Sequence, residues 1–337
     1  GREDDEDEEE AMWEREATSG TDRDVHRPQL RRAALLLLLT VPIVGITFGG
    51  INETYLPPSQ ATRQAQDELA ATSHQRLAAA YDAGVMDDLV TPFRGLDRDN
   101  NLRPDSTPEK LAGLKPAFGR HLGEEATMTA ANSTPLTDGA SAVLLSSEEW
   151  AAERGLPVLA EFVDMENAAV DFVDGHEGLL MAPAYAMPRL LARQGLRLQD
   201  IDLVEIHEAF ASTVVATLTA WEDEQFCRER LGLDEPVGPV DRSRLNVNGS
   251  SLATGHPFAA TGGRIVASLA KMLHEKGAGS LGLVSVCAAG GQGIEEPLSG
   301  TFNAGAAGGE AAVDGQGKQP GSQSARKFHG QTPVDQL

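Results

Sequence analysis

Cysteine is the scarcest residue type with reactive chemistry in this chain, which holds only Cys227 and Cys287 among 337 residues. Two distant cysteines form neither a disulfide framework nor the paired spacing of a structural metal site. A disulfide-stapled fold is therefore excluded, and we expect no bound metal. The shortage also favours a reducing compartment, so we predict a cytoplasmic protein.

Basic charge is in short supply as well. The chain has 28 Lys and Arg residues against 51 Asp and Glu residues, which gives a formal net charge of -23. A field of this sign repels a phosphate backbone, because non-specific binding to nucleic acid is electrostatic. We therefore expect no nucleic-acid partner.

The N-terminal part of the sequence falls into two segments. Residues 1–32 open on an acidic run without an apolar period, so we predict a disordered acidic N-terminus there. The first residue is Gly rather than Met, which indicates a fragment or an incomplete gene model. The second segment, residues 33–58, opens on an uncharged run over 33–50 that directly follows Arg31 and Arg32.

Two interpretations of residues 33–50 stay open. As a helix, the run would rise roughly 27 Å and could cross a membrane with the arginine pair on the cytoplasmic side. As a strand and turn, it would belong to the buried core of an α/β protein, because Pro42 and the glycines weaken a helix. We favour the buried strand, with membrane association through 33–50 as the alternative.

The central part of the chain alternates between helix-like and strand-like patterns. Such alternation indicates a layered α/β fold. In residues 59–150 the pattern predicts a helix over 62–84, a loop over 91–115, a strand over 128–134 and a helix over 139–147. In residues 151–294 it predicts strands over 158–162, 203–207 and 281–287, and helices over 187–194, 209–221 and 259–276, with Pro188 in the first turn of its helix.

The apolar pattern stops at residue 295. The following stretch is rich in Gly, Ala, Ser and Gln, and Pro297 cannot donate a hydrogen bond in a central sheet. We therefore predict a disordered tail over 295–337.

Three short segments place reactive side chains beside glycine-rich or helical chain. They contain His207, His256 and Cys287. A thiol and an imidazole that lie close together can exchange a proton near neutral pH. Each residue alone also fits a structural role: a polar residue at a helix start, a turn histidine and a small core residue.

Taken together, the three segments resemble the C-terminal signature blocks of thiolases, in the same order. The blocks are HEAF from His207, NG through GHP from Asn248 to Pro257, and CAAGGQG from Cys287. Because the first block holds His, the sequence resembles in particular the β-oxidation acetyl-CoA C-acyltransferase that forms the β-subunit of the trifunctional complex. LKPAF from Leu114 and TAANS from Thr129 are also similar to that family.

The resemblance spans residues 59–294 and implies a thiolase-like layered αβαβα fold. Residues 59–150 would be a remnant of the N-terminal domain, and residues 151–294 would be the C-terminal domain. The family's nucleophilic cysteine lies in its first half, but this sequence has no cysteine before Cys227. The N-terminal half is therefore expected to be incomplete.

The resemblance also implies roles for individual residues. The reaction would be the ping-pong acyl transfer of a 3-ketoacyl-CoA thiolase of fatty acid β-oxidation. In it, His256 activates the nucleophile and helps to hold the thioester oxygen, Cys287 moves the proton at the substrate α-carbon, and His207 orders water or substrate in the oxyanion hole. Backbone around Ala289 and Gly290 would form a second oxyanion site.

Ligands and partners follow from the same resemblance. Ser133, Thr134 and Phe258 would contact the coenzyme A thioester, which is a substrate, and no resident cofactor is implied. A homodimer and a hydratase/dehydrogenase α-subunit are the implied protein partners. A mitochondrial location is an alternative to the cytoplasm.

Two functional hypotheses stay open. The first is a thiolase-family acyltransferase that is inactive as this chain because the nucleophile is absent. The second is a non-catalytic thiolase-like protein that acts in an interaction or as a membrane-tethered subunit, and coenzyme A binding without acyl transfer lies between the two.

Overall fold

The computed structural model describes residues 62–301, apart from 121–122, 124–125 and 174–176. The predictions for 1–32, for 33–58 and for the tail beyond residue 301 lie outside the described residues. Within the described ranges, no helix is both long enough and apolar enough to cross a membrane.

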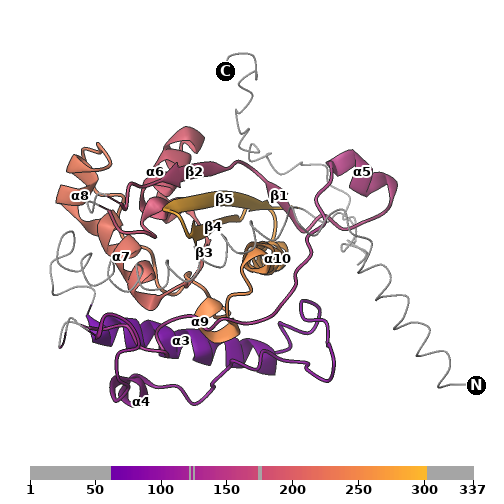
Figure 1. Ribbon diagram of the computed structural model, residues 1–337. Helices are drawn as coiled ribbons and strands as arrows, with labels where there is room; N and C mark the ends of the chain where they lie inside the picture. Colours follow the sequence, from indigo (N-terminus) through magenta and orange to yellow (C-terminus); the bar gives the residue numbers. More distant parts are fainter. Residues whose placement is uncertain (1–61, 121–122, 124–125, 174–176, 302–337) are drawn as a thin grey trace, which may run out of the picture. The chain divides into compact units, whose positions relative to one another are not determined.

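A mixed sheet of five strands lies at the centre of this part of the chain (Figure 1). Its order is β1-β5-β4-β3, and β2 also pairs with β5. β3 and β4 run parallel, whereas β5 is antiparallel to β1, β2 and β4. The strands are β1 (Ala160–Phe162), β2 (Glu166–Ala169), β3 (Leu203–Ile206), β4 (Leu281–Ala288) and β5 (Gln292–Gly300).

The described helices lie before β1, between β2 and β3, and between β3 and β4 in sequence. The longer ones are α3 (Arg63–Asp82), α6 (Ala182–Gln194), α7 (Ala211–Glu222) and α10 (Ala259–Lys276). The shorter ones are α4 (Pro108–Ala112), α5 (Glu148–Glu153), η2 (Leu198–Asp200), α8 (Glu224–Glu229) and α9 (Ser251–Thr254).

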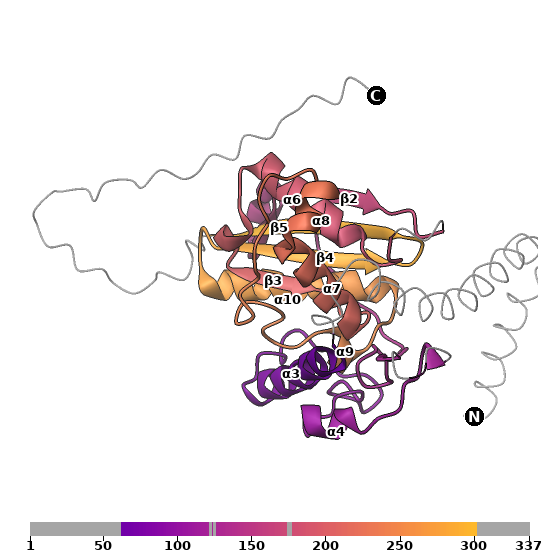
Figure 2. The same cartoon turned by 90° about the vertical axis from the view of Figure 1, so that its left-hand side faces the viewer.

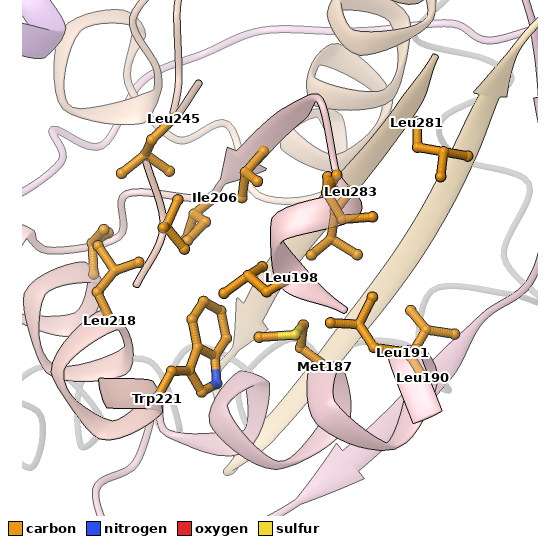
Figure 3. Close-up of a cluster of buried hydrophobic side chains, with 14 residues drawn as sticks. Met187, Leu190, Leu191, Leu198, Ile206, Leu218, Trp221, Leu245, Leu281 and Leu283 are labelled. Atoms are coloured by element: carbon orange, nitrogen blue, oxygen red, sulfur yellow. The ribbon is translucent and has the colours of Figure 1, made fainter. Parts of the chain in front are cut away.

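Helices cover both faces of the sheet. The side chains of β4 alternate between the faces, as in any strand. Leu281 and Leu283 join the apolar cluster formed with α6 and α7 (Figure 3), whereas Val284 packs against Leu269 and Leu273 of α10. Figure 2 shows α6 and α10 on opposite sides of the strands. Each fully buried leucine contributes roughly 1.5–3 kcal/mol to the stability of the fold. The helices on the two faces of the sheet confirm the predicted layered α/β architecture.

α3 confirms the helix predicted over 62–84. The Thr62 hydroxyl accepts from the Ala65 N–H at 3.1 Å and so caps the first turn. Ala70, Ala71 and Leu77 are buried on one side of the helix, which contacts α7 and α9. The helix therefore packs against α9, which carries Ser251, and against α7, the helix that follows His207 in sequence.

β5 contradicts the prediction that a disordered tail begins at residue 295. The strand continues through Pro297 to Gly300 and pairs with β4 along its length. The Pro297 carbonyl accepts from the Val163 N–H at 3.1 Å, so its backbone polar atoms point toward the break between β1 and β2. A ladder hydrogen bond is not needed at that break, which is why proline is tolerated in this strand.

Pro188 does not lie in the first turn of its helix, as the sequence had indicated. α6 begins at Ala182, so Pro188 falls in the helix interior and leaves the Ala184 carbonyl without its usual donor. The indole N–H of Trp221 donates to that carbonyl at 3.2 Å instead. A side chain from α7 thus supplies the hydrogen bond that proline removes.

Two further predictions in the N-terminal part are wrong. Residues 128–134 form a bend between two isolated β-bridges rather than a strand, and the Asn132 side chain accepts from the Thr129 N–H at 2.7 Å within that bend. Residues 139–147 form no helix; they run irregularly past the start of α10, where the Ser141 hydroxyl donates to the Ala260 carbonyl at 2.7 Å. In the first segment a local bond from a side chain to the backbone competes with strand formation, and in the second a tertiary hydrogen bond overrides local propensity.

Candidate active site

His207 follows directly on β3. Its N–H donates to the Ser285 carbonyl of β4 at 2.8 Å, which continues the parallel pairing by one residue. Its side chain is only 1% exposed, and its Nδ1 lies 2.7 Å from Oγ of Ser251. β3 and α9 together therefore hold the imidazole.

His256 follows α9 in sequence, and its ring lies next to that of His207. Its N–H donates to the Pro135 carbonyl at 3.1 Å, and its Nδ1 lies 2.7 Å from the hydroxyl oxygen of Thr261 on α10. The rings of His207 and His256 are 4.4 Å apart between centroids and tilted by 43°. Two histidines from separate sequence motifs thus form one site.

The surroundings keep both rings neutral. Burial lowers the pKa of His207 well below its usual value, and the positive charges of His256 and Arg264 would lower it further. Burial also lowers the pKa of His256, with Arg264 adding to the effect. A neutral imidazole can accept a proton or donate its single N–H, so both roles are available at neutral pH.

Cys287 lies near the end of β4, opposite Gly293 of β5. Its parallel neighbour β3 ends just before His207, so Cys287 and His207 lie at the same carboxyl edge of the sheet. Burial raises the pKa of the Cys287 thiol to about 12, and Glu295 adds repulsion of the thiolate. The strand register places Cys287 at the same edge of the sheet as His207, whereas the contact between rings involves the two histidines.

Ala289 and Gly290 lie in the exposed turn that connects β4 to β5. Gly290 has φ of 93° and the next residue, Gly291, has φ of 77°, a region that favours glycine. A Cβ on Gly291 would come within 2.6 Å of the Val170 carbonyl oxygen. The glycines therefore let this turn close tightly beside Cys287.

The three residues predicted to contact coenzyme A differ in their surroundings. The Thr134 hydroxyl donates to the Ser251 carbonyl at 2.7 Å, and Ser133 is buried in a bridge with Phe210. Phe258 is half exposed, and its ring centroid lies 5.0 Å from that of His256. Thr134 ties the loop to the site, whereas Phe258 offers apolar surface next to the histidines.

Sequence reasoning assigned no role to Glu208, although it lies within the first motif. Its buried carboxylate accepts from Ser73 of α3 at 2.7 Å, from Asn246 at 2.8 Å and from the Leu252 N–H at 3.1 Å. These bonds join α3, the 246–250 turn and α9 immediately behind His207. Its position directly after the candidate histidine was the sequence signal that could have identified Glu208.

Metal-binding geometry is not found in the part of the chain that the structure describes. No group of three or more His, Cys, Asp or Glu side chains there is arranged to hold an ion.

Comparison with known sequences and structures gives a consistent match. The family description of the thiolase C-terminal domain matches residues 156–298, and that of the thiolase N-terminal domain matches residues 18–149. A 3-ketoacyl-CoA thiolase of Pectobacterium carotovorum is 43% identical over 255 residues, which cover 74% of this chain and 57% of that protein. The chain thus spans a little over half the length of this curated relative.

Solved structures agree with the sequence match. The dimeric peroxisomal thiolase of Saccharomyces cerevisiae is 31% identical, with a TM-score of 0.61 over 76% of this chain and 58% of that one. Human mitochondrial 3-ketoacyl-CoA thiolase in complex with CoA is also 31% identical, with a TM-score of 0.61 and the same coverage.

Proposed function

Because this chain belongs to the thiolase family, we propose that it carries the acid–base half of a 3-ketoacyl-CoA thiolase, an acyltransferase of fatty acid degradation. The contact between the His207 and His256 rings at the carboxyl edge that also carries Cys287 supports this proposal most directly. Thiolysis needs two proton movements and one stabilised carbonyl oxygen, and these residue types can provide them.

His256 is the proposed base for the acyl-accepting thiol. Thr261 holds its Nδ1, so Nε2 is the nitrogen that would take the thiol proton as the sulfur attacks the 3-keto carbonyl of the substrate. The attack forms a C–S bond and breaks the bond between the 3-keto carbon and the α-carbon, and the bonding electrons leave on the α-carbon. When CoA later attacks the acyl group, the imidazolium returns its proton to the departing sulfur of the nucleophile. The lowered pKa of His256 favours rapid return of that proton.

Cys287 is the proposed proton carrier at the substrate α-carbon. The raised pKa of about 12 keeps Cys287 a thiol, and in cleavage this thiol gives its proton to the α-carbon as the carbon–carbon bond breaks. The thiolate that remains takes the thiol proton of CoA in the second half of the reaction, so the Cys287 thiol re-forms. His207 and the backbone around Ala289 and Gly290 are the proposed donors to the thioester oxygen.

Coenzyme A and a second copy of the chain are the proposed partners. The first proposal rests on the likeness to the human thiolase in complex with CoA, and the second on the likeness to the dimeric yeast thiolase. Ser133, Thr134 and Phe258 stay the proposed contacts of the thioester. A hydratase/dehydrogenase α-subunit and a cytoplasmic location remain predictions from the sequence.

The proposed nucleophile is a cysteine outside these 337 residues, since none precedes Cys227. Cys227 is fully buried against the Ala220 and Trp221 carbonyls and cannot serve. The same observation favours a second candidate function, coenzyme A binding without acyl transfer. We expect these residues alone to bind a coenzyme A thioester without cleaving it.

An activity test with added N-terminal domain separates the two functions. The purified chain is mixed with acetoacetyl-CoA and free CoA, with or without the Cys-bearing N-terminal half of the Pectobacterium relative, and acetyl-CoA is quantified. No product from the chain alone and product from the mixture supports the thiolase function. Product from the chain alone would show that a residue within it is acylated, and binding without product in either case would support the second function.

A further inference from the structure

Ser251, the first residue of α9, lies between a histidine and an arginine. Its Oγ is 2.7 Å from Nδ1 of His207, and Nη2 of Arg264 on α10 donates to the same oxygen at 2.9 Å. Ser251 is fully buried. Three elements, β3, α9 and α10, thus meet at one hydroxyl group.

The direction of the bond between Ser251 and His207 follows from counting protons. A guanidinium can only donate, so the serine oxygen accepts from Arg264. Within the described residues, the remaining recorded partner of this oxygen is His207 Nδ1. The hydroxyl proton therefore points at Nδ1, which accepts it, and the single proton of the neutral ring lies on Nε2.

The opposite tautomer leaves more groups unsatisfied. A proton on Nδ1 would leave the serine hydroxyl proton without an acceptor and Nε2 as a bare lone pair. Nε2 is buried and has no hydrogen-bond partner among the described residues. With its proton on Nε2, the ring has one N–H donor that forms no hydrogen bond within the described residues. A substrate oxygen can accept from such a donor.

We propose that Ser251 and Arg264 act as positioning residues that fix His207 as the Nε2–H tautomer, so that Nε2 donates to the thioester carbonyl oxygen. The identity of that oxygen rests on the proposed function, whereas the tautomer rests on the geometry alone. A histidine that takes a thiol proton needs an unprotonated nitrogen facing the substrate, whereas a histidine that donates to an oxyanion needs a protonated one. We call the hydrogen-bonded chain from Arg264 through Ser251 to His207 the relay. It distinguishes His207 from His256, whose Nδ1 lies 2.7 Å from the Thr261 hydroxyl.

Burial lowers the pKa of Arg264, whereas Glu205, Glu208 and Asp99 favour its protonated form and oppose that shift. Arg264 therefore remains a donor while it repels a second proton on His207, so the ring stays neutral when the oxyanion forms.

Nuclear magnetic resonance tests the tautomer without any requirement for activity. The chain is labelled with ¹⁵N at its eight histidines, and long-range ¹H–¹⁵N correlations show which ring nitrogen of each histidine carries the proton. The His207→Gln spectrum identifies the His207 signals by their loss. We expect Nε2 of His207 to be protonated and Nδ1 to show the shift of a hydrogen-bonded acceptor.

Substitutions then test the relay. Ser251→Ala should move the Nδ1 signal to the position of an unbonded acceptor and populate the Nδ1–H form, whereas Ser251→Thr should retain the wild-type pattern. Ser250→Ala is the matched control, because it removes a buried hydroxyl from the adjacent position without touching the ring. Its spectrum should match the wild type at His207.

Two results would overturn the proposal. One is a wild-type His207 that carries its proton on Nδ1 or on both nitrogens, which needs no variant to observe. The other is a folded Ser251→Ala protein whose His207 signals do not move. A correct tautomer in a chain that binds no coenzyme A thioester would support the relay and count against the proposed function, so the two failures are distinguishable.

Discussion

Ser285 of β4 and Glu295 of β5 stand opposite each other in the antiparallel register, and the serine hydroxyl donates to Glu295 Oε1 at 2.7 Å. Glu295 is fully buried, and burial raises its pKa well above the usual range, with repulsion from Glu296 adding to the effect. A buried carboxyl group with a raised pKa therefore lies inside the sheet, on the face of β4 that also carries Cys287.

Ser285→Ala should destabilise the fold by about 1–3 kcal/mol, because it removes the donor to a buried carboxyl group. Glu295→Leu combined with Ser285→Ala should recover most of that loss, since an apolar pair leaves no unsatisfied group. Urea unfolding of the wild type, the two single variants and the double variant gives the coupling energy. Additive effects of the two substitutions would show that the hydrogen bond contributes nothing.

Glu205→Gln should change how stability depends on pH. Burial raises the pKa of Glu205 to about 8, with Glu208 adding to the rise and Arg264 opposing it. The folded state then keeps a proton that the unfolded state loses, so stability falls as pH rises from the usual glutamic acid range to about 8. The Gln variant lacks this loss and should be more stable than the wild type by about 1–3 kcal/mol at pH 8.

Urea unfolding at pH 5, 7 and 8 checks that expectation. Glu161→Gln is the matched control, because it makes the same chemical change at an exposed position of β1. Parallel stability curves for the wild type and Glu205→Gln would refute a raised pKa at Glu205.

Cys287→Ala should separate acylation from carbon chemistry in the enzyme completed with a Cys-bearing N-terminal half. If Cys287 carries only the α-proton, exchange of that proton with deuterated water should fall by about 10²-fold or more. Acylation of the nucleophile by acetyl-CoA should continue, and mass spectrometry measures both quantities. Loss of acylation with retained exchange would assign Cys287 the opposite role.

His256→Ala should have the converse effect. Removing the base for the nucleophilic thiol should slow acylation by about 10²–10⁴-fold near neutral pH. The deficit should shrink at higher pH, where the thiol ionises without help. A rate deficit that stays constant from pH 7 to 9 would show that His256 acts only through structure.

Gly291→Ala and Gly290→Ala form a matched pair at the β4–β5 turn. Both glycines have positive φ, so each substitution should cost about 1 kcal/mol of backbone strain. Only at Gly291 does the added Cβ also meet the Val170 carbonyl, at 2.6 Å, whereas the space at Gly290 is open. Thermal unfolding should therefore show a clearly larger loss for Gly291→Ala, and equal losses would rule out a close approach.

Local pattern predicted the elements whose signals are local. α10 begins and ends where its apolar period and Gly277 indicate, and α3 differs from its predicted range by a residue or two at each end. The predictions for β5 and Pro188 were wrong because they considered each proline only within its own strand or helix. In the fold, its missing N–H falls at a strand break in one case and is replaced by Trp221 in the other.

The candidate site divides in the same way. His207, His256 and Cys287 stand in motifs that the sequence displays. Ser251 and Arg264 act through a hydroxyl where three elements meet, and no spacing along the chain encodes that meeting. Protonation of a ring nitrogen is set by such meetings, so it is visible only once the chain is folded.

The Trp221 bond to the Ala184 carbonyl makes the effects of substitutions at positions 188 and 221 depend on each other. Trp221→Phe alone strands a buried carbonyl, while Trp221→Phe with Pro188→Ala lets the new N–H of residue 188 reclaim its helical acceptor. Pro188→Ala alone sets two donors in competition for one oxygen. The residue tolerated at position 188 of α6 thus depends on the residue at position 221 of α7, and Trp221→Phe alone should be the least stable of the four combinations in thermal unfolding.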